Sequence, residues 1–354
     1  MTAQQLPPPL RGRVGVGGEP KAPPLIELRE VVKEFSITSG ALQRRVGVVH
    51  AVSGVSLSVP AGSTFGLVGE SGCGKTTIGR MIVGLERPTA GSITFDGRDL
   101  STLSPRERKR LHRDRQLVFQ DPYASLDPRM RVGEIVREPL AIHRLGSRRQ
   151  QQATVVRLLD EVGLPHDAVS RYPHEFSGGQ RQRIGLARAL ALNPRLIVAD
   201  EPVSALDVSI RSQVLNLMRD LQRRHDLTYI VISHDLTVVR YVSDLLGVMY
   251  LGKLVETGDA EAIYARPAHP YTAALMATIP LPDPVRERAK SHGLIRGELP
   301  SATSPPPGCR FHTRCPRAGD ICRSVEPPLR PFGERHLAAC HFPLQEPVEG
   351  SSAA

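Results

Sequence analysis

Short apolar runs rich in β-branched residues dominate the chain between residues 25 and 95. Turn signals such as Asp96-Gly97 separate these runs, which is the pattern of β-strands joined by tight turns. The predicted strands cover residues 25–28, 48–52, 55–59, 64–68 and 92–95. The first part of the chain is therefore expected to be rich in β-structure.

Further along the chain, strands alternate with helices. The apolar runs 196–199 and 228–232 predict fully buried parallel strands. Between them, apolar residues recur at helical spacing, at Val208, Val214, Leu215, Leu217, Met218 and Leu221. This strand–helix–strand order predicts an α/β fold with a parallel sheet.

Helical patterns dominate the region between Asp121 and Tyr172. One clear example is the set Val155, Val156, Leu158, Leu159 and Val162. We therefore expect a helical insertion at about residues 121–175, within the α/β core.

Composition adds two tails to this picture. The 354 residues are enough for two domains, and the 31 Gly and 31 Pro residues exceed the usual share of about 12%. Ten of them fall in residues 1–24, which hold few large apolar groups and are predicted to be a disordered tail. Residues 346–354 are predicted to form a second loose tail.

The formal net charge of +10 favours anionic partners such as nucleotides, nucleic acid or a membrane face. Basic residues gather at Arg106, Arg108, Lys109, Arg110, Arg113 and Arg115. Because Glu107 and Asp114 interrupt this group and the chain has no Trp, we interpret it as a solvated helix face. No apolar run reaches the ~18 residues of a membrane helix, and no signal peptide is evident, so a cytoplasmic chain is expected.

A glycine-rich segment, Gly-Glu-Ser-Gly-Cys-Gly-Lys-Thr-Thr at 69–77, follows the strand 64–68 directly. It fits the phosphate-loop pattern, in which backbone N–H groups and a helix N-terminus hold phosphate oxygens. Lys75 would reach the β and γ phosphates, and the Thr76 hydroxyl would hold Mg²⁺. The predicted nucleotide-binding residues are Gly69, Ser71, Gly72, Cys73, Gly74, Lys75, Thr76 and Thr77. For Cys73, the backbone rather than the thiol is expected to matter.

Two carboxylates, Asp200 and Glu201, end the apolar run 196–199. Ligands in open α/β sheets bind at the carboxyl ends of the strands. Asp200 is therefore expected to accept the water shell of Mg²⁺. Glu201 would orient or deprotonate the attacking water, which is worth roughly 10² to 10⁴ in rate. Taken alone, the pair could be an ordinary solvated strand end, but the phosphate loop favours the catalytic interpretation.

Further motifs occur in a fixed order around these residues. Phe176-Ser177-Gly178-Gly179-Gln180 precedes a helix-like run at 181–191, Ser-Ala-Leu-Asp occupies 204–207, and Gln120 and His234 flank them. The whole arrangement, over residues 25–265, resembles the ATP-binding cassette of ABC proteins. That resemblance implies a P-loop NTPase with a RecA-like core, an antiparallel β subdomain and a helical insertion.

The resemblance also implies roles for individual residues. ATP and Mg²⁺ would lie between two cassettes, with Ser177, Gly178 and Gly179 donating to the γ-phosphate of the partner's ATP. Gln120 would sense the γ-phosphate, the attacking water and Mg²⁺, and His234 would contact the γ-phosphate. Asp207 would link the two sites. Phe35 would stack on adenine, with core packing as the alternative. The expected catalytic residues are Glu201, His234, Gln120 and Lys75.

This sequence departs from the family pattern at two places, with Phe176 where Leu is common and Val203 where Thr is frequent. Neither residue is expected to touch a phosphate ligand. The chain is therefore expected to supply a complete catalytic half-site.

A second resemblance covers the remainder of the chain. The segment 119–129 and Ala268-His269-Pro270-Tyr271-Thr272 are similar to ATPase subunits of oligopeptide and dipeptide importers. It implies a C-terminal extension at 266–345 and a motor on the cytoplasmic face of the cell membrane. The implied partners are a second ATPase subunit, more often a paralogue than a copy, two transmembrane permease subunits and, indirectly, an extracytoplasmic solute-binding protein.

Two alternatives to peptide import remain. Motors for nickel, glutathione or other small solutes are built in the same way, so the cargo is open. A nucleic-acid-linked cassette is disfavoured, because the sequence has no long coiled coil, second cassette or inserted zinc module. No nucleic-acid partner is therefore expected.

Four cysteines, Cys309, Cys315, Cys322 and Cys340, are spaced C-x₅-C-x₆-C-x₁₇-C in a loop-rich region. In a reducing compartment such a group suggests a metal, although the C-x₂-C unit of common zinc sites is missing. Four thiolates suit a [4Fe–4S] cluster or Zn²⁺, and free or structural thiols are the third possibility. The importer resemblance favours the iron–sulfur cluster.

Overall fold

The computed structural model describes residues 23–39, 44–121, 125–279 and 297–348. Most of the predicted N-terminal tail and the end of the predicted C-terminal tail lie outside these residues. Two sheets organise the described chain. The smaller has the order β2-β1-β4-β5, and the larger has the order β11-β12-β10-β9-β3-β8-β7-β6.

The smaller sheet is antiparallel, as predicted for the β subdomain. It consists of β1 (Ile26–Ser39), β2 (Arg44–Val59), β4 (Ala90–Phe95) and β5 (Arg98–Asp99). The two runs predicted at 48–52 and 55–59 form one strand rather than two. Val55 pairs with Val31 and Ser53 with Val32, so Gly54 lies between them in a bulge with a positive φ of 71°. A bulge bends a strand without ending it.

The centre of the larger sheet is parallel. Its parallel strands are β3 (Thr64–Val68), β6 (Arg115–Val118), β7 (Leu196–Asp200), β8 (Thr228–Ser233) and β9 (Leu245–Tyr250). Every residue of β3, β7 and β8 is buried, as their continuous apolar sequences predict. The carboxyl ends of these parallel strands meet at one edge of the sheet, where the candidate site lies.

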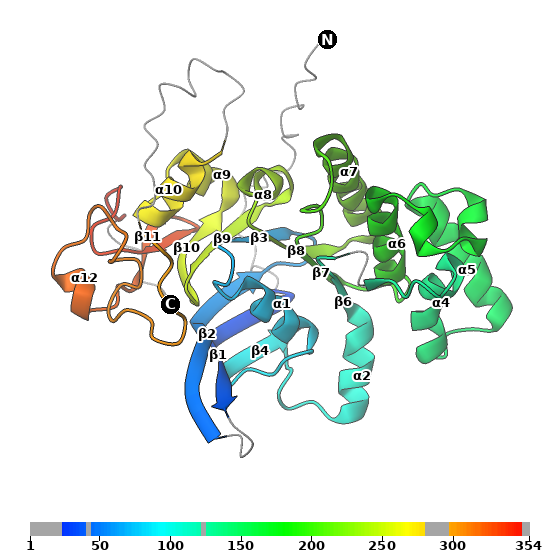
Figure 1. The fold of residues 1–354 in the computed structure, drawn as a ribbon, viewed down its shortest axis with the longest axis horizontal. Coiled ribbons are helices and arrows are strands. Elements are labelled where there is room, and N and C mark those ends of the chain that lie inside the picture. Colours follow the sequence, from blue (N-terminus) through cyan, green and yellow to red (C-terminus); the bar gives the residue numbers. More distant parts are fainter. Residues whose placement is uncertain (1–22, 40–43, 122–124, 280–296, 349–354) are drawn as a thin grey trace, which may run out of the picture.

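Helices cover the core sheet and extend beyond both of its edges (Figure 1). Those between the first strands and the end of the core are α1 (Lys75–Val83), α2 (Pro105–Asp114), α4 (Val132–Ile142), α5 (Arg148–Glu161), α6 (Gly178–Leu190), α7 (Val208–His225), α8 (Leu236–Val242) and α9 (Ala260–Ala265). The 3₁₀ turns η1 (His166–Ser170) and η2 (Pro173–Glu175) precede α6. The helical region predicted at 121–175 thus holds α4, α5 and both 3₁₀ turns, which pack with α6 in one apolar core.

The region after Arg266 is joined to the core sheet. It contains α10 (Pro270–Ala277), α12 (Ile321–Ser324), β11 (Leu329–Gly333) and β12 (His336–Ala339). β12 pairs antiparallel with β10 (Lys253–Asp259), so this region extends the core sheet at the edge opposite β6 (Figure 1). The sequence predicted a loop-rich extension but not these shared strands.

One buried carboxylate fastens this junction. Glu256, on β10, is fully buried and accepts hydrogen bonds from the backbone N–H groups of Ala268 and His269 at 2.7 and 2.9 Å. Its Oε1 also lies 2.6 Å from Nε2 of His336. A buried carboxylate needs such partners, because leaving it unpaired would cost several kcal/mol, on the order of 3 to 5.

Two sequence-based expectations about α2 and α7 were wrong in part. Arg115 is not on a solvated helix face: it begins β6, is 3% exposed and donates to the carbonyl oxygen of Ile82 at 2.6 Å. Burial lowers the pKa of its guanidinium to about 10. Val208 belongs to no buried stripe, because it is 76% exposed at the first residue of α7. In the described residues, no helix is long and apolar enough to cross a membrane.

Candidate functional site

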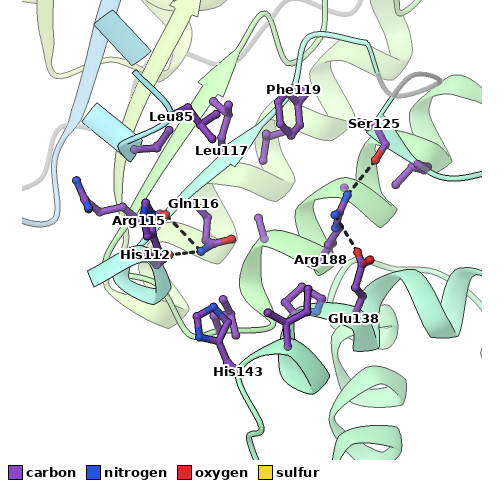
Figure 2. A pocket seen from close by; sticks show the side chains of 18 of the residues that line it. Leu85, His112, Arg115, Gln116, Leu117, Phe119, Ser125, Glu138, His143 and Arg188 are labelled. Carbon is purple, nitrogen blue, oxygen red and sulfur yellow. Dashed lines mark hydrogen bonds and ion pairs between the residues drawn. The ribbon is translucent and has the colours of Figure 1, made fainter. Parts of the chain in front are cut away.

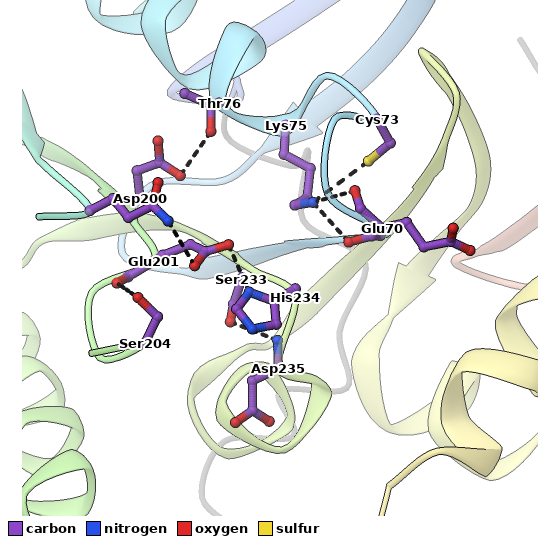
Figure 3. Close-up of polar contacts among 12 residues, drawn as sticks. Glu70, Cys73, Lys75, Thr76, Asp200, Glu201, Ser204, Ser233, His234 and Asp235 are labelled. Carbon is purple, nitrogen blue, oxygen red and sulfur yellow. Dashed lines mark hydrogen bonds and ion pairs between the residues drawn. The ribbon is translucent and has the colours of Figure 1, made fainter. Parts of the chain in front are cut away.

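The phosphate loop connects β3 to α1, as the sequence predicts. The Lys75 ammonium donates to the carbonyl oxygens of Gly69 and Glu70 at 2.8 and 2.9 Å (Figure 3). Lys75 is almost fully buried, so these bonds hold a charge inside the loop. Gly74 has a φ of 105°, and a Cβ there would lie 2.2 Å from the carbonyl oxygen of Ala51. Only glycine fits this position.

Cys73 lies inside the same loop and is fully buried. Its Sγ is 3.7 Å from Nζ of Lys75, and its carbonyl oxygen accepts from the N–H of Gly252 at 2.9 Å. Burial raises the pKa of the thiol, so it is protonated at neutral pH. That the backbone of Cys73 matters more than its sulfur stays a prediction.

Asp200 and Thr76 form the pair expected to hold Mg²⁺. The Thr76 hydroxyl donates to Oδ1 of Asp200 at 3.1 Å, which joins the start of α1 to the end of β7 (Figure 3). Burial raises the pKa of Asp200, and the nearby Glu201 acts in the same direction. A hydroxyl and a carboxylate beside a phosphate loop are oxygen donors of the kind that Mg²⁺ prefers. The residues present therefore fit the ion.

Glu201 is held from both sides. Its Oε1 lies 2.8 Å from Nδ1 of His234, and its Oε2 accepts from the Gln120 side-chain amide at 3.2 Å. Glu201 has a left-handed φ of 47°, and its N–H donates to the carbonyl oxygen of Ile232 on β8 at 2.8 Å. Such strained backbone is typical of functional sites. The structure thus brings together Glu201, His234 and Gln120, three of the four expected catalytic residues. The fourth, Lys75, lies at the start of α1 near the same carboxyl ends of the strands (Figure 3).

The predicted signature forms the N-terminus of α6. Ser177 is the N-cap and accepts from the N–H of Gln180, so the free N–H groups of the first turn remain directed outward from the helix end. A Cβ on Gly179 would lie 2.3 Å from Cγ2 of Ile210, so α6 packs closely on the first turn of α7. Asp207 is the N-cap residue of α7. The signature and Asp207 therefore lie at neighbouring helix starts.

Phe35 lies on β1 and is 38% exposed, with Nζ of Lys33 at 4.8 Å from its ring centroid. An exposed ring on the β subdomain is open to stacking, and core packing does not account for it. Its adenine-binding role stays a prediction, as do the individual roles of the other site residues.

A groove of about 270 Å³ lies between β6 and the helices α4 and α6 (Figure 2). Leu85, Phe119 and Ile142 on its walls are 59%, 46% and 59% exposed. Arg188, on α6, donates to the Ser125 carbonyl oxygen at 2.9 Å and to Glu138 at 3.0 Å. The walls of the groove thus include Ser125, Leu126 and α6, the helix that begins at the signature.

The four C-terminal cysteines lie in one region. Burial raises the pKa of Cys309 to about 11, and the nearby thiols of Cys322 and Cys315 act in the same direction. Burial likewise raises the pKa of Cys340 to about 12. Thiol donors suit iron or zinc, yet in the described part of the chain no three Cys, His, Asp or Glu side chains are placed to hold a metal ion. This arrangement does not support the predicted iron–sulfur cluster or its zinc alternative.

The fold and site define a P-loop nucleotide-binding ATPase. Two family models match the chain: "ABC transporter" at residues 52–204, and "Oligopeptide/dipeptide transporter, C-terminal region" at residues 255–322. The chain is 52% identical over 319 residues to the oligopeptide transport ATP-binding protein AppF of Bacillus subtilis, which covers 90% of this chain and 97% of AppF. A putative peptide import ATP-binding protein of Brucella ovis is 50% identical over 317 residues, with 90% and 97% covered. The chain belongs to the ABC transporter family.

Solved structures agree with this assignment. The ATP-binding cassette MJ0796, in a dimeric post-hydrolysis state bound to ADP and Pi, is 28% identical and matches with a TM-score of 0.59. The match covers 66% of this chain and 98% of that cassette. CbiO1 from Clostridium perfringens, with a TM-score of 0.60 and 24% identity over 69% of this chain and 92% of its own, supports the fold alone. Both the RecA-like core and the antiparallel subdomain are confirmed.

Proposed function

We propose that this chain is the ATP-hydrolysing motor subunit of an importer for di- and oligopeptides. The observation that carries the proposal is the Glu201 carboxylate, held by His234 and Gln120 beside an intact phosphate loop. The peptide cargo is supported by the names of the relatives and by the match to the oligopeptide transporter C-terminal region. Motors for nickel or glutathione remain the alternative.

In this proposal, the loop from Gly69 to Thr77 binds the ATP phosphates, and Lys75 moves from loop carbonyls to phosphate oxygens. Mg²⁺ would be held by Thr76 and Asp200, with Gln120 nearby, and would neutralise charge on the phosphates. Glu201 orients the attacking water, and His234 holds the carboxylate in place. Ser177, Gly178 and Gly179 donate to the ATP of the partner cassette, because a helix N-terminus favours an anion.

The groove beside β6 is the proposed docking site of a permease subunit. Its apolar walls suit an apolar helix from a membrane protein, and one wall continues directly into Gln120, which touches Glu201. The other wall is α6, whose first turn carries the signature. A force on the groove would therefore reach both halves of a composite ATP site. This assignment puts the motor on the cytoplasmic face of the membrane, where a binding protein on the far side would deliver the cargo.

Uptake in reconstituted vesicles tests the proposed cargo. The complex of this chain, its partner cassette, the permease subunits and the solute-binding protein should import a labelled peptide only when ATP is enclosed with the motor. Unlabelled peptides should compete, and nickel or glutathione should not. Uptake of nickel or glutathione without competition by peptides would replace the peptide assignment with the alternative.

The partner cassette is proposed to be a paralogue. With ATP bound and hydrolysis blocked in Glu201→Gln, the chain alone should stay monomeric in size-exclusion chromatography with light scattering. A stable ATP-dependent homodimer would contradict the paralogue and would leave the motor assignment intact.

The metal content of the cysteine group is decided by direct analysis. The family resemblance predicts about four iron and four sulfide per chain after anaerobic purification, lost in Cys309→Ser and Cys322→Ser. Among the described residues the thiols are not placed to hold a metal ion, so the structure gives this prediction no support. The ATPase assignment does not depend on the result, because no cysteine of this group contacts the Glu201 site in the described residues.

A further inference from the structure

Glu70, the second residue of the phosphate loop, is held by two residues from the region after Arg266. Nη1 of Arg314 donates to both carboxylate oxygens of Glu70 at 2.9 Å. The hydroxyl of Tyr271 accepts from the N–H of Glu70 at 3.0 Å. One loop residue is therefore held at its side chain by a residue 244 positions away in sequence and at its backbone by a residue 201 positions away.

Both contacts are partly buried, and the two residues that make them are more buried than Glu70 itself. The Arg314 side chain is 8% exposed and also donates to the Tyr250 hydroxyl at 3.3 Å. Tyr271 is fully buried, and its ring packs against Tyr250 and Phe311 with centroids 4.7 and 5.2 Å away. This aromatic packing restricts the position of the Tyr271 hydroxyl, which accepts from Glu70.

The Tyr271 contact sets the direction of the peptide bond between Gly69 and Glu70. In a trans peptide, the carbonyl oxygen and the N–H point to opposite sides. Because Tyr271 holds the Glu70 N–H on one side, the Gly69 carbonyl oxygen faces the other side, where it accepts from Lys75 at 2.8 Å. Tyr271 thereby helps to position the lysine that is assigned to the phosphates.

The Arg314 contact controls charge. An unpaired Glu70 carboxylate next to the phosphate loop would repel an incoming triphosphate. In the structure this carboxylate points away from Lys75 (Figure 3), toward the Arg314 guanidinium, which compensates its charge. A partly buried pair is screened less by salt than a surface pair.

We propose that Arg314 and Tyr271 are positioning residues of the ATP site, through which the region after Arg266 sets the affinity of the phosphate loop for ATP. The proposal rests on the assignment of residues 69–77 as the ATP-binding loop. It gives the C-terminal region a role in nucleotide binding, in addition to any role of its cysteines.

Equilibrium binding of a fluorescent ATP analogue to the purified full-length chain tests the proposal. Arg314→Gln should weaken binding about five- to tenfold, as expected for a coupled pair. Adding Glu70→Gln to Arg314→Gln should restore most of the affinity, because no carboxylate is then left unpaired. Tyr271→Phe, which keeps the ring and removes the hydroxyl, should weaken binding about two- to fivefold.

Matched variants separate this role from simple loss of structure. Glu326→Gln breaks the ion pair of Glu326 with Lys253, which lies in the same region but does not involve Glu70, and should leave ATP binding unchanged. Arg314→Lys should recover part of the affinity. If Arg314→Gln binds ATP within twofold of the unchanged chain, or if Glu70→Gln fails to restore binding, the proposal is wrong.

The variant Lys75→Ala distinguishes failure of this positioning role from failure of the proposed ATP-binding function. It should abolish ATP binding if residues 69–77 form the ATP-binding loop. Persistent binding in Lys75→Ala would refute the proposed function itself. Loss of binding in Lys75→Ala, together with unchanged binding in Arg314→Gln, would refute only the positioning role.

Discussion

At the scale of single residues, backbone geometry decides which groups can reach the phosphates. Gly72 and Gly74 both have positive φ values, 78° and 105°, but their surroundings differ. A Cβ on Gly74 would collide with the Ala51 carbonyl oxygen, whereas a Cβ on Gly72 would meet nothing within 4 Å. The phosphate-loop pattern requires glycine at position 74 and leaves position 72 open, and the Ala51 carbonyl oxygen gives a physical reason for this difference.

This difference gives a matched pair of variants. Gly74→Ala should displace the phosphate loop and weaken ATP binding at least tenfold, which corresponds to about 1.4 kcal/mol. Gly72→Ala carries only the strain of its positive φ, roughly 1 kcal/mol, and should retain binding within a fewfold. Titration with a fluorescent ATP analogue measures both. Equal loss in the two variants would show that the Ala51 contact is not the cause.

At the scale of elements, the sequence predicted the motifs and the buried strands well, because both are local patterns. Glycine-rich phosphate loops and continuous apolar runs are read from neighbouring residues. The joining of β12 to β10 and the contact of Arg314 with Glu70 depend on residues far apart in sequence. No local pattern encodes such pairs, so the sequence could not predict how the C-terminal region attaches.

That attachment should depend on pH through His269. Its ring is fully buried, which lowers its pKa to about 4, and its Nδ1 accepts from the N–H of Tyr271 at 3.0 Å. Between pH 6.5 and 4 the unfolded chain binds a proton that the folded chain excludes, so stability is lost as the pH falls. The loss could reach about 3 kcal/mol across this window.

His269→Asn tests this contribution, because Asn can also cap α10 but does not titrate. Thermal unfolding between pH 7 and 5 should show a smaller fall in Tm for His269→Asn than for the unchanged chain. Parallel Tm curves for His269→Asn and the unchanged chain would rule out His269 as the source.

At the scale of the whole molecule, the groove of Figure 2 is next in sequence to the proposed ATP site, because Phe119 on its wall precedes Gln120, which donates to Glu201. Ile142→Asp should put a charge on its apolar wall and uncouple the motor from the permease, while ATP binding by the isolated chain stays unchanged. Val325→Asp, at another exposed apolar residue outside the groove, is the control. Pull-down of permease subunits measures the coupling, and equal retention of permease by both variants would contradict the docking site.

The most direct test of the account compares Glu201→Gln with the unchanged chain in the assembled complex. Glu201 is the residue on which hydrolysis is proposed to depend. Glutamine keeps its shape and still accepts from Gln120 through its amide oxygen, while its amide nitrogen can donate only to an unprotonated Nδ1 of His234. We expect ATP to bind with near-normal affinity and the rate of phosphate release to fall at least 10²-fold. Phosphate release at an unchanged rate would contradict the assignment of this site as the motor.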